Sequence, residues 1–482
     1  ESMTPKQLTA TVGSGPVWLK SGNQIVWLVG GTPTSTPGVA SAAPASDPAP
    51  TVPKKGFGKF PAAGAPVTGG GYSFAVRHLI DLPARNATVF DTSWRVMRDH
   101  WYDAKLGNAD WAKVRAKYRP IAEQAPDLET VQTCVQMMLG ELNGSHLGFT
   151  LNPKAEPKTT EPRDTTAHLG VRFDLAHNGP GLKIRDIITG GPAEKKRSRL
   201  EAGEIILKID GVEVANTMDL TLVLNGPLDR EMNLVVQSKK GDARDVALRP
   251  ISYAAAQTLL YDHWLRHNRK AVADASGGKL GYLHISAMSM PNFRKFEEEL
   301  VSEGSGRDGL IIDVRENPGG SIADHLLTAL TQPVHAITVP RGGGPGYPMD
   351  RKVYVSWHKP IIVLCNQNSG SNAEIFSHAI KTLKRGQLVG VPTAGAVVST
   401  GTTPVMDVGM LRLPTRGWFT LNDGEDMEKN GAVPHYLLWL DPCTLPQGQD
   451  AQLARAIELL QADVAAWKAR PQPKLKLSTE RP

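Results

Sequence analysis

The strongest constraint on the fold is a regular alternation of apolar and amphipathic segments between residues 254 and 465. Short apolar runs, typical of buried strands, are followed by stretches with apolar residues three and four positions apart, typical of helices. The apolar runs are KLGYLHIS, GLIIDVREN, PIIVLCN and QLVGVPT, and the helical segments are MPNFRKFEEELVS, SIADHLLTALTQ and NAEIFSHAIKTL. This β-α-β order predicts an α/β sandwich domain over residues 254–467, with ligands bound beyond the carboxyl ends of its strands.

The rest of the 482-residue chain differs in pattern, so we expect a multidomain protein of mixed α+β and α/β class. Residues 72–162 contain two amphipathic segments and predict a helical subdomain, with Asp127 as an N-cap. Residues 34–71 are rich in Pro, Ala, Gly, Ser and Thr, which predicts a linker, and residues 468–482 form a C-terminal tail. Residues 1–33 hold two β-rich runs around KSGNQ, a hairpin pattern that cannot bury a core by itself.

Residues 163–253 consist of short strand-like runs separated by turns. The segment GGPAEKKRSRLEAGEIILKIDGVEV resembles the PDZ signature, with Glu204 in place of the usual Asp. The resemblance implies a PDZ-like domain whose sheet edge takes up an extended peptide. The backbone N–H groups of Leu169, Gly170 and Val171 would then lie beside the peptide's terminal carboxylate. A PDZ fold that serves only as a spacer is the alternative.

Charge and cysteine content argue against several functional classes. The formal net charge of +6 is mildly basic, and the densest basic run, EKKRSRLE, is typical of a solvated loop, so we expect no nucleic-acid partner. The three cysteines are scattered, and neither HExxH nor a phosphate-binding loop is present, so we expect no metal and no other cofactor. No apolar run is long enough to span a membrane.

Two serines lie at the turn between the apolar run KPIIVLC and the helix that follows it. In NQNSGSNAEIF, Ser369 or Ser371 could cap the helix, or one of them could be a nucleophile near the positive helix N-terminus. A second strand ends in the turn DVRENPGGS, whose glycines let backbone N–H groups approach a ligand. A third segment, ELNGSHLGF, carries His146, whose imidazole titrates near neutral pH and suits a general base.

Taken together, these segments resemble the tricorn proteases. GSHLGF, DVRENPGGS, NQNSGSNAEIF, GVPTAG and MEKNGAVPH follow the sequence layout of that family, and the resemblance covers about residues 72–465. It implies that residues 1–33 are a partial β-propeller remnant. The related C-terminal processing proteases use a Ser–Lys pair, but Ala396 stands where their lysine would be. This position favours the tricorn branch and a histidine base.

The resemblance assigns a role to each member of a catalytic tetrad. Ser371 is the expected nucleophile, and His146 is the expected general base and later the acid for the leaving amine. Ser145 and Glu428 are expected to hold the imidazole in the required tautomer, as an Asp does in a simpler triad.

The resemblance also implies an oxyanion hole formed by the N–H groups of Gly319 and Asn372. Asn372 replaces the Asp that is usual in the family, Pro318 interrupts the glycine run, and His435 stands where an Asp is common. Backbone donors survive the first two changes, and the sequence offers no physical account of the third. Arg341, in the glycine-rich loop, is a candidate for a substrate pocket that favours acidic side chains.

We therefore predict a serine endopeptidase or oligopeptidase that cleaves peptides or unfolded polypeptides through an acyl-enzyme intermediate. The alternative is a non-catalytic peptide-binding protein that uses its PDZ groove. An esterase is disfavoured because GxSxG is absent around Ser371. The family resemblance implies a homo-oligomer. The Ala/Pro-rich linker slightly favours export over a cytoplasmic location, and the missing initiator methionine suggests a fragment or a processed piece.

Overall fold

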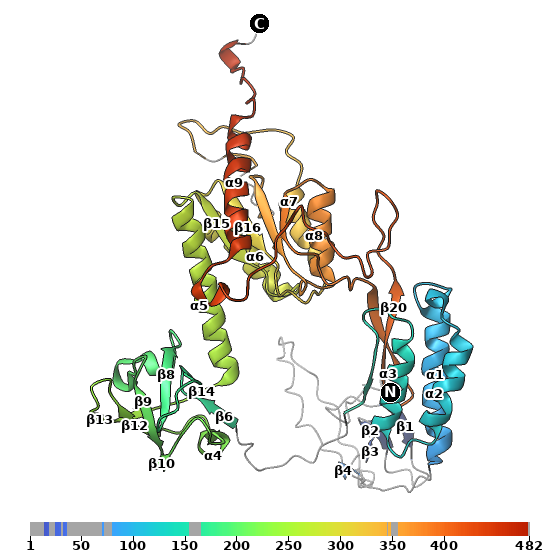
Figure 1. The fold of residues 1–482 in the computed structure, drawn as a ribbon. Helices are drawn as coiled ribbons and strands as arrows, with labels where there is room; N and C mark the ends of the chain where they lie inside the picture. Colours follow the sequence, from blue (N-terminus) through green and yellow to red (C-terminus); the bar gives the residue numbers. More distant parts are fainter. Residues whose placement is uncertain are drawn as a thin grey trace, which may run out of the picture. The chain divides into compact units, whose positions relative to one another are not determined.

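The computed structural model of the chain divides into two compact units, Glu1–Asp81 and Leu82–Pro482 (Figure 1). The structure describes residues 14–18, 25–29, 32–35, 70–71, 80–153, 165–344, 346–348 and 355–480. The larger unit contains the helical, PDZ-like and α/β regions that the sequence predicts.

The smaller unit contains one antiparallel sheet of four strands in sequence order. These are β1 (Ser14–Trp18), β2 (Ile25–Val29), β3 (Thr32–Ser35) and β4 (Gly70–Gly71). The predicted hairpin is therefore extended by two strands from the ends of the predicted linker. A four-stranded antiparallel sheet is the unit from which propeller blades are built. One sheet is not a propeller, so the propeller remnant stays a prediction.

The helical region packs three helices around a common apolar core. They are α1 (Leu82–His100), α2 (Trp111–Glu123) and α3 (Leu128–Gly140), with a 3-10 turn η1 (Leu106–Asn108) between the first two. Asp127 accepts a hydrogen bond from the Thr130 N–H at 2.7 Å, which confirms the predicted N-cap. The apolar faces of these helices meet in one buried cluster that includes Phe90, Met97 and Val135.

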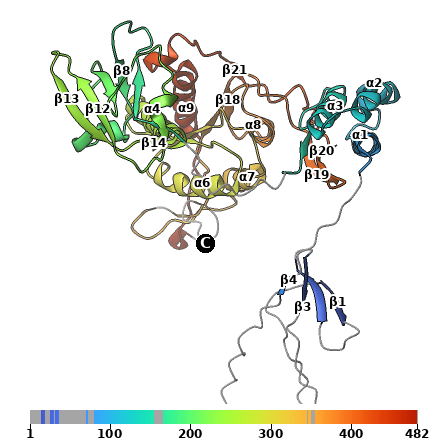
Figure 2. The same cartoon turned by 90° about the horizontal axis from the view of Figure 1, so that it is seen from below.

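A hairpin from far along the chain completes this helical region. Strand β5 (Gly148–Leu151) pairs with β20 (Gly409–Arg416), which pairs with β19 (Ser399–Val405). Val405 and Leu411 of the hairpin are fully buried in the same cluster as the helices, and β20 lies against α1 (Figure 2). Residues 399–416 were predicted as part of the α/β domain. Sequence periodicity does not reveal which core a strand joins, because that depends on non-local packing.

The PDZ-like region has two small sheets around a core of aliphatic side chains. Five strands follow the order β13-β12-β9-β8-β7, with β10 paired to β9, and β6 lies between β11 and β14 in a second sheet. The bounds are β6 (Thr165–His168), β7 (Val171–Phe173), β8 (Leu182–Ile187), η2 (Pro192–Glu194), η3 (Lys196–Ser198), β9 (Ile205–Ile209), β10 (Val212–Glu213), α4 (Thr221–Leu224), β11 (Asn225–Gly226), β12 (Met232–Gln237), β13 (Ala243–Leu248) and β14 (Ile251–Ser252).

The α/β region is built on a parallel sheet with the order β15-β16-β17-β18-β21. Every residue of the first three strands is buried, as expected when helices cover both faces of a parallel sheet. The bounds are α5 (Tyr253–Ala275), β15 (Leu280–His284), α6 (Met290–Ser302), β16 (Gly309–Asp313), α7 (Ala323–Thr331), β17 (Ile361–Cys365), α8 (Asn372–Thr382), β18 (Gln387–Gly390), β21 (Tyr436–Leu437), η4 (Leu445–Gln447), α9 (Ala451–Ala469) and η5 (Ser478–Glu480).

Alternate residues of each central strand face opposite layers of helices. Leu310 and Ile312 of β16 pack with α6, α7 and α8, while Ile311 packs with α5 and α9 (Figure 1). The predicted α/β sandwich is thereby confirmed. The carboxyl ends of β16 and β17 lead directly into the glycine-rich turn and the serine turn, so the two turns are neighbours in space.

Candidate active site

Ser371 occupies a sharp turn between β17 and α8. Its φ and ψ angles are 51° and −117°, a region that side chains other than glycine rarely adopt. The turn places Ser371 immediately before the first residue of α8, where a helix carries positive partial charge and unbonded N–H groups. A strained serine at a strand-to-helix turn is the geometry in which a nucleophilic hydroxyl is presented to substrate.

The other serine of this turn, Ser369, has a structural role. It is completely buried, its hydroxyl donates to the Val314 carbonyl at 2.8 Å, and it accepts from the Asn366 N–H at 2.9 Å. Both of these contacts stabilise the loop between β17 and α8. The contacts of Ser369 are therefore those of a structural residue, and Ser371 stays the predicted nucleophile.

A buried carboxylate that the sequence analysis missed organises the serine turn. Glu374 is fully buried and accepts from the Ser371 N–H at 2.9 Å. Its second set of donors comes from the segment after β18: the Thr393 hydroxyl at 2.5 Å, the Gly395 N–H at 2.6 Å and the Ala396 N–H at 2.8 Å. The Ser-x-x-Glu spacing from Ser371 was the available signal, because it is the spacing of a helix capping box.

The glycine-rich turn packs directly on the serine turn. A Cβ atom added to Gly319 would lie 2.6 Å from the Ser371 Cβ and 3.0 Å from the Asn372 nitrogen. No side chain fits there, and the φ of 101° at this position also favours glycine. The Gly319 N–H donates to the Asn317 carboxamide oxygen at 2.9 Å. Binding of an oxyanion by Gly319 therefore requires this intraloop hydrogen bond to be exchanged.

A buried ion pair supports the glycine-rich turn from below. Asp313, fully buried at the end of β16, accepts from the Arg315 guanidinium at 2.7–3.0 Å and from the Tyr282 hydroxyl at 2.7 Å. The positive charge and hydrogen bonds of Arg315 lower the pKa of Asp313 even though burial alone would raise it. Arg315 also pairs with Asp450 at 2.8 Å, so the start of α9 is tied to the base of the turn.

His146 lies in the loop between α3 and β5, next to Ser145. The Ser145 hydroxyl donates to Glu428 Oε2 at 2.9 Å and lies 3.0 Å from His146 Nδ1. Because the hydroxyl has one proton and gives it to the carboxylate, His146 Nδ1 must donate to the hydroxyl oxygen. The neutral imidazole then has an unprotonated Nε2, which is the atom that a general base needs.

Glu428 is the anchor of this histidine loop. Its carboxylate accepts from the Ser145 N–H at 2.6 Å as well as from the hydroxyl, and from the Val397 and Val398 N–H groups at 3.0 and 3.3 Å. The Glu428 N–H donates to Asp426, which in turn accepts from the Tyr102 hydroxyl at 2.7 Å. Ser145 and the backbone of Val397 and Val398, which precede β19, therefore converge on one carboxylate.

Consecutive residues link the serine turn to the histidine loop. The N–H groups of Gly395 and Ala396 bind Glu374, and those of Val397 and Val398 bind Glu428. Four adjacent backbone N–H groups thus connect Glu374, which binds the serine turn, to Glu428, which binds Ser145. The sequence did not predict that Glu374 and Glu428 accept hydrogen bonds from the same backbone segment, because these contacts depend on the tertiary structure.

The electrostatic environment keeps His146 neutral at physiological pH. Burial is the largest cause that lowers its pKa below 6.5, and the positive charge of Arg412 lowers it further. The negative charge of Glu428 and a contact with the Val398 backbone act in the opposite direction. A base with a pKa below neutrality is unprotonated, and so competent, at pH 7.

Two departures from the family pattern now have a structural explanation. The Asn372 side-chain oxygen accepts from the Ala323 N–H at 2.8 Å and so ties the start of α8 to the start of α7. His435 Nδ1 accepts from the Leu388 N–H at 3.0 Å, while the His435 N–H donates to the Leu388 carbonyl at the same distance. The imidazole thus supplies a strand-like hydrogen bond to β18, a task that requires its neutral form.

The predicted PDZ peptide site lies at an edge of its sheet. Strand β7, which starts at Val171, pairs only with β8 in the described part of the chain. The Gly170 N–H donates to His168 Nδ1 at 3.0 Å, and the Leu169 side chain is buried. Arg341 is exposed in a turn after α7. The roles proposed for these residues stay predictions.

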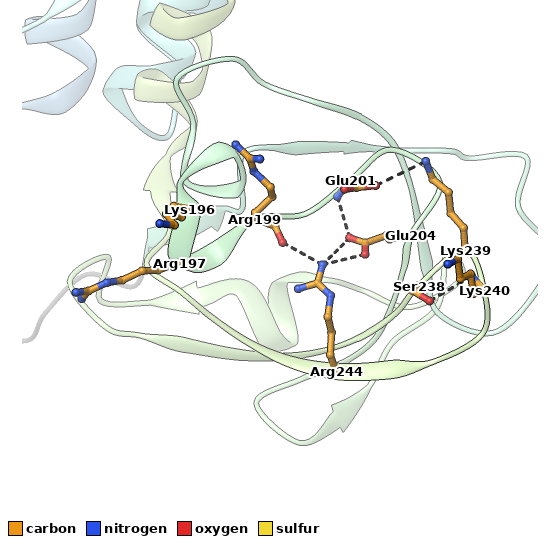
Figure 3. A pocket seen from close by; sticks show the side chains of 9 residues that line it. All are labelled: Lys196, Arg197, Arg199, Glu201, Glu204, Ser238, Lys239, Lys240 and Arg244. Atoms are coloured by element: carbon orange, nitrogen blue, oxygen red, sulfur yellow. Dashed lines mark hydrogen bonds and ion pairs between the residues drawn. The ribbon is translucent and has the colours of Figure 1, made fainter.

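A basic pocket of about 470 Å³ lies elsewhere on the PDZ-like region (Figure 3). Inside it Arg244 donates to both oxygens of the buried Glu204, at 2.8 and 2.9 Å, and to the Arg199 carbonyl at 3.0 Å. Lys239 lies 3.9 Å from Glu201. The basic run EKKRSRLE thus contributes to a polar surface whose carboxylates are already paired.

The described residues contain no cluster of three or more His, Cys, Asp or Glu side chains able to hold a metal ion. In the same residues, every helix is too short or too polar to cross a membrane.

Comparison with family models identifies the class of the chain. The peptidase family S41 model matches residues 279–438, which hold the serine turn and the glycine-rich turn. The tricorn protease C1 domain matches residues 83–140, and the tricorn protease PDZ domain matches residues 168–253. The serine turn and the glycine-rich turn therefore lie in the part of the chain that is similar to the S41 peptidases, and the PDZ-like region is similar to the tricorn protease PDZ domain.

Individual relatives with similar sequences include tricorn proteases and their homologs. The chain is 28% identical over 412 residues to tricorn protease homolog 1 of Streptomyces coelicolor, covering 83% of this chain and 37% of the relative. It is 26% identical over 397 residues to the tricorn protease of Thermoplasma volcanium, covering 79% and 37%. The crystal structure of the tricorn protease has the same fold, with a TM-score of 0.69 at 21% identity, covering 94% of this chain and 42% of that chain. The chain is thus similar to the tricorn proteases over most of its length, and it spans less than half the length of these relatives.

Proposed function

We propose that the chain is a serine peptidase in which Ser371 forms an acyl-enzyme and His146 is the general base. One observation carries the proposal: four successive N–H groups, from Gly395 to Val398, bind the two carboxylates that organise the serine turn and the histidine loop. If Ser371 only capped the helix, Glu374 would be sufficient and Glu428 would not be needed. A histidine with a purely structural role would not need the carboxylate of Glu428 to act on it through the Ser145 hydroxyl.

In the proposed reaction, the Ser371 hydroxyl attacks the substrate carbonyl while His146 Nε2 takes its proton. The positive charge that forms on the imidazole is stabilised by Glu428 through the Ser145 hydroxyl, which bonds to both groups. His146 then gives its proton to the leaving amine. Water hydrolyses the acyl-enzyme by the same steps with His146 again as base.

The negative oxygen of the tetrahedral intermediate would be stabilised by backbone donors at the start of α8. The Asn372 N–H belongs to the first turn of the helix, where such donors have no intrahelical partner. Gly319 contributes its N–H once its bond to Asn317 is exchanged for the oxyanion. Preorganised donors of this kind typically supply about 10²–10³ in rate each.

We further propose that the substrates are peptides or unfolded polypeptides and that the working form is a homo-oligomer. The tricorn relatives carry the name protease, which supports the peptide bond as the target. The alternative, peptide binding without catalysis, is supported by the edge strand β7, which leaves backbone groups for an added peptide strand.

A fluorophosphonate probe separates these alternatives. The proposal expects covalent labelling of Ser371, with labelling lost in Ser371→Ala, and cleavage of denatured casein or fluorogenic peptides that is lost in His146→Ala. A folded wild-type chain that binds peptides but is neither labelled nor able to cleave any of them would support the binding protein instead.

A further inference from the structure

An arginine on the hairpin lies beside the histidine loop. Arg412, on β20, is paired in register with Gly148 of β5, two residues after His146. Its side chain is exposed, and among the described residues it forms no ion pair and no side-chain hydrogen bond. A guanidinium offers several donors in a planar fork and is usually satisfied by an acceptor when it lines a site.

The strand geometry directs this side chain into the space that Gly148 leaves open. A Cβ atom added to Gly148 would lie 3.5 Å from Arg412 Cδ and 3.8 Å from Arg412 Cγ. Residues directly opposite on paired strands present their side chains on the same face of the sheet. The aliphatic stem therefore covers the Gly148 backbone, next to the loop that carries His146.

The charge of Arg412 reaches the imidazole. Burial is the largest cause that lowers the pKa of His146, and the positive charge of Arg412 is the second. The negative charge of Glu428 acts in the opposite direction and raises this pKa. In the proposed reaction His146 becomes positively charged twice, so an uncompensated guanidinium nearby disfavours both steps. A negative group from the substrate would remove that disadvantage.

We propose that Arg412 is a specificity-determining residue that binds a substrate carboxylate on the leaving-group side of the scissile bond. The side follows from the role of His146, which must contact the leaving amine in order to protonate it. The preferred substrates are then peptides with Asp or Glu just after the cleaved bond. This inference rests on the proposed peptidase function.

The test uses two internally quenched peptides that differ only in Asp or Asn after the cleaved bond, both with amidated C-termini. The cleavage position is verified by mass spectrometry. Wild-type protein should prefer the Asp peptide in kcat/KM by roughly tenfold, as one charge-assisted hydrogen bond supplies. Arg412→Gln should abolish the preference, Arg412→Lys should keep part of it, and Arg412→Glu should reverse it toward a Lys peptide.

Arg416→Gln is the matched control, because Arg416 is an exposed arginine on the same strand. It should leave the preference unchanged. An equal preference in wild-type protein and Arg412→Gln would overturn the inference. The inference would also be overturned if wild-type protein preferred a peptide with a free C-terminus over the amidated peptide but showed no preference for Asp over Asn. The bound carboxylate would then be that of the chain end.

A pH profile separates substrate binding from a structural role. For the wild type, the acid-side midpoint of kcat should be higher with the Asp peptide than with the Asn peptide, because the bound carboxylate offsets the charge of Arg412. In Arg412→Gln the two midpoints should coincide. If wild-type protein is neither labelled at Ser371 nor cleaves any peptide, the peptidase proposal fails. If it does both with no role for Arg412, only this inference fails.

Discussion

The serine turn and the histidine loop each depend on one buried glutamate, but they are assembled from different lengths of chain. Ser371 and Glu374 lie three residues apart on a continuous strand-turn-helix segment. His146 is held by Ser145 next to it and by Glu428, which lies 283 residues from Ser145. The serine turn is therefore largely local in origin, whereas the histidine loop exists only when the helical region and the α/β region are both folded.

This difference has an energetic consequence. Glu374 is fully enclosed by its own helix and by residues 393–396, so its removal should mainly affect stability. Glu428 sits on a network that ends at the imidazole, so its removal should mainly affect catalysis. Variants on both sides of the site should show this contrast, starting with the largest expected effect.

Replacement of Ser371 by alanine should reduce kcat by about 10⁶-fold, because the nucleophile is lost while binding is retained. Peptide turnover and fluorophosphonate labelling measure this loss. Ser369→Ala is the matched control, since Ser369 lies two residues away but its hydroxyl is engaged by Val314 and Asn366. It should lose stability by about 1–3 kcal/mol and keep labelling at Ser371. Labelling that survives in Ser371→Ala would move the nucleophile elsewhere.

Glu428→Gln should lower kcat by about 10³–10⁴-fold, comparable to removing the acid of a catalytic triad, because the imidazole loses its orienting charge. The companion variant Glu374→Gln should instead show a reduced free energy of unfolding, by about 1–3 kcal/mol, in urea denaturation. Steady-state kinetics and denaturation of both proteins measure the contrast. Equal effects on rate and stability in the two variants would remove the distinction between the two sides of the site.

Gly319→Ala should reduce kcat by about 10²–10³-fold, the cost of a displaced oxyanion donor. The added methyl group would lie 2.6 Å from the Ser371 Cβ, so the two turns must separate. Gly343→Ala controls for backbone strain alone, because Gly343 also has a positive φ but has no atom within 4 Å of the added methyl group. Similar kinetics in both variants would show that strain, rather than contact with the serine turn, causes the loss.

The smallest effect expected is a shift in pH dependence. Since His146 acts as a base when neutral and its pKa is lowered by burial and by Arg412, kcat/KM should rise with pH through a midpoint below 6.5. Arg412→Gln should move this midpoint upward. A midpoint above 6.5 in the wild type would contradict the burial of His146 in its neutral form.

The lowered pKa of His146 also makes the free energy of unfolding depend on pH. A histidine whose pKa is lower in the folded state binds fewer protons than in the unfolded chain, so stability rises with pH in this range. The contribution of His146 is fully present above pH 6.5 and is lost as the pH falls through its folded-state value. His146→Gln should therefore show a weaker loss of stability on acidification below pH 6.5 than the wild type.

Local patterns in the sequence determined much of this protein. The apolar runs predicted the strands of the parallel sheet, because a strand buried on both faces must be apolar throughout. The turns after two of those strands predicted where the candidate site would lie, because the carboxyl ends of parallel strands meet at one edge. The family motifs supplied the candidate residues within those turns.

Only the tertiary structure showed that Ser369 is buried and that the Val397 and Val398 N–H groups bind Glu428. The Ser-x-x-Glu spacing already favoured Ser371 as the helix cap, and the structure adds that Ser369 is buried. Hairpin 399–416 joins the helical core rather than the α/β core, and this places Val397 and Val398 on Glu428. Such contacts arise from packing between distant segments, and hydrophobic periodicity carries information only about neighbours along the chain.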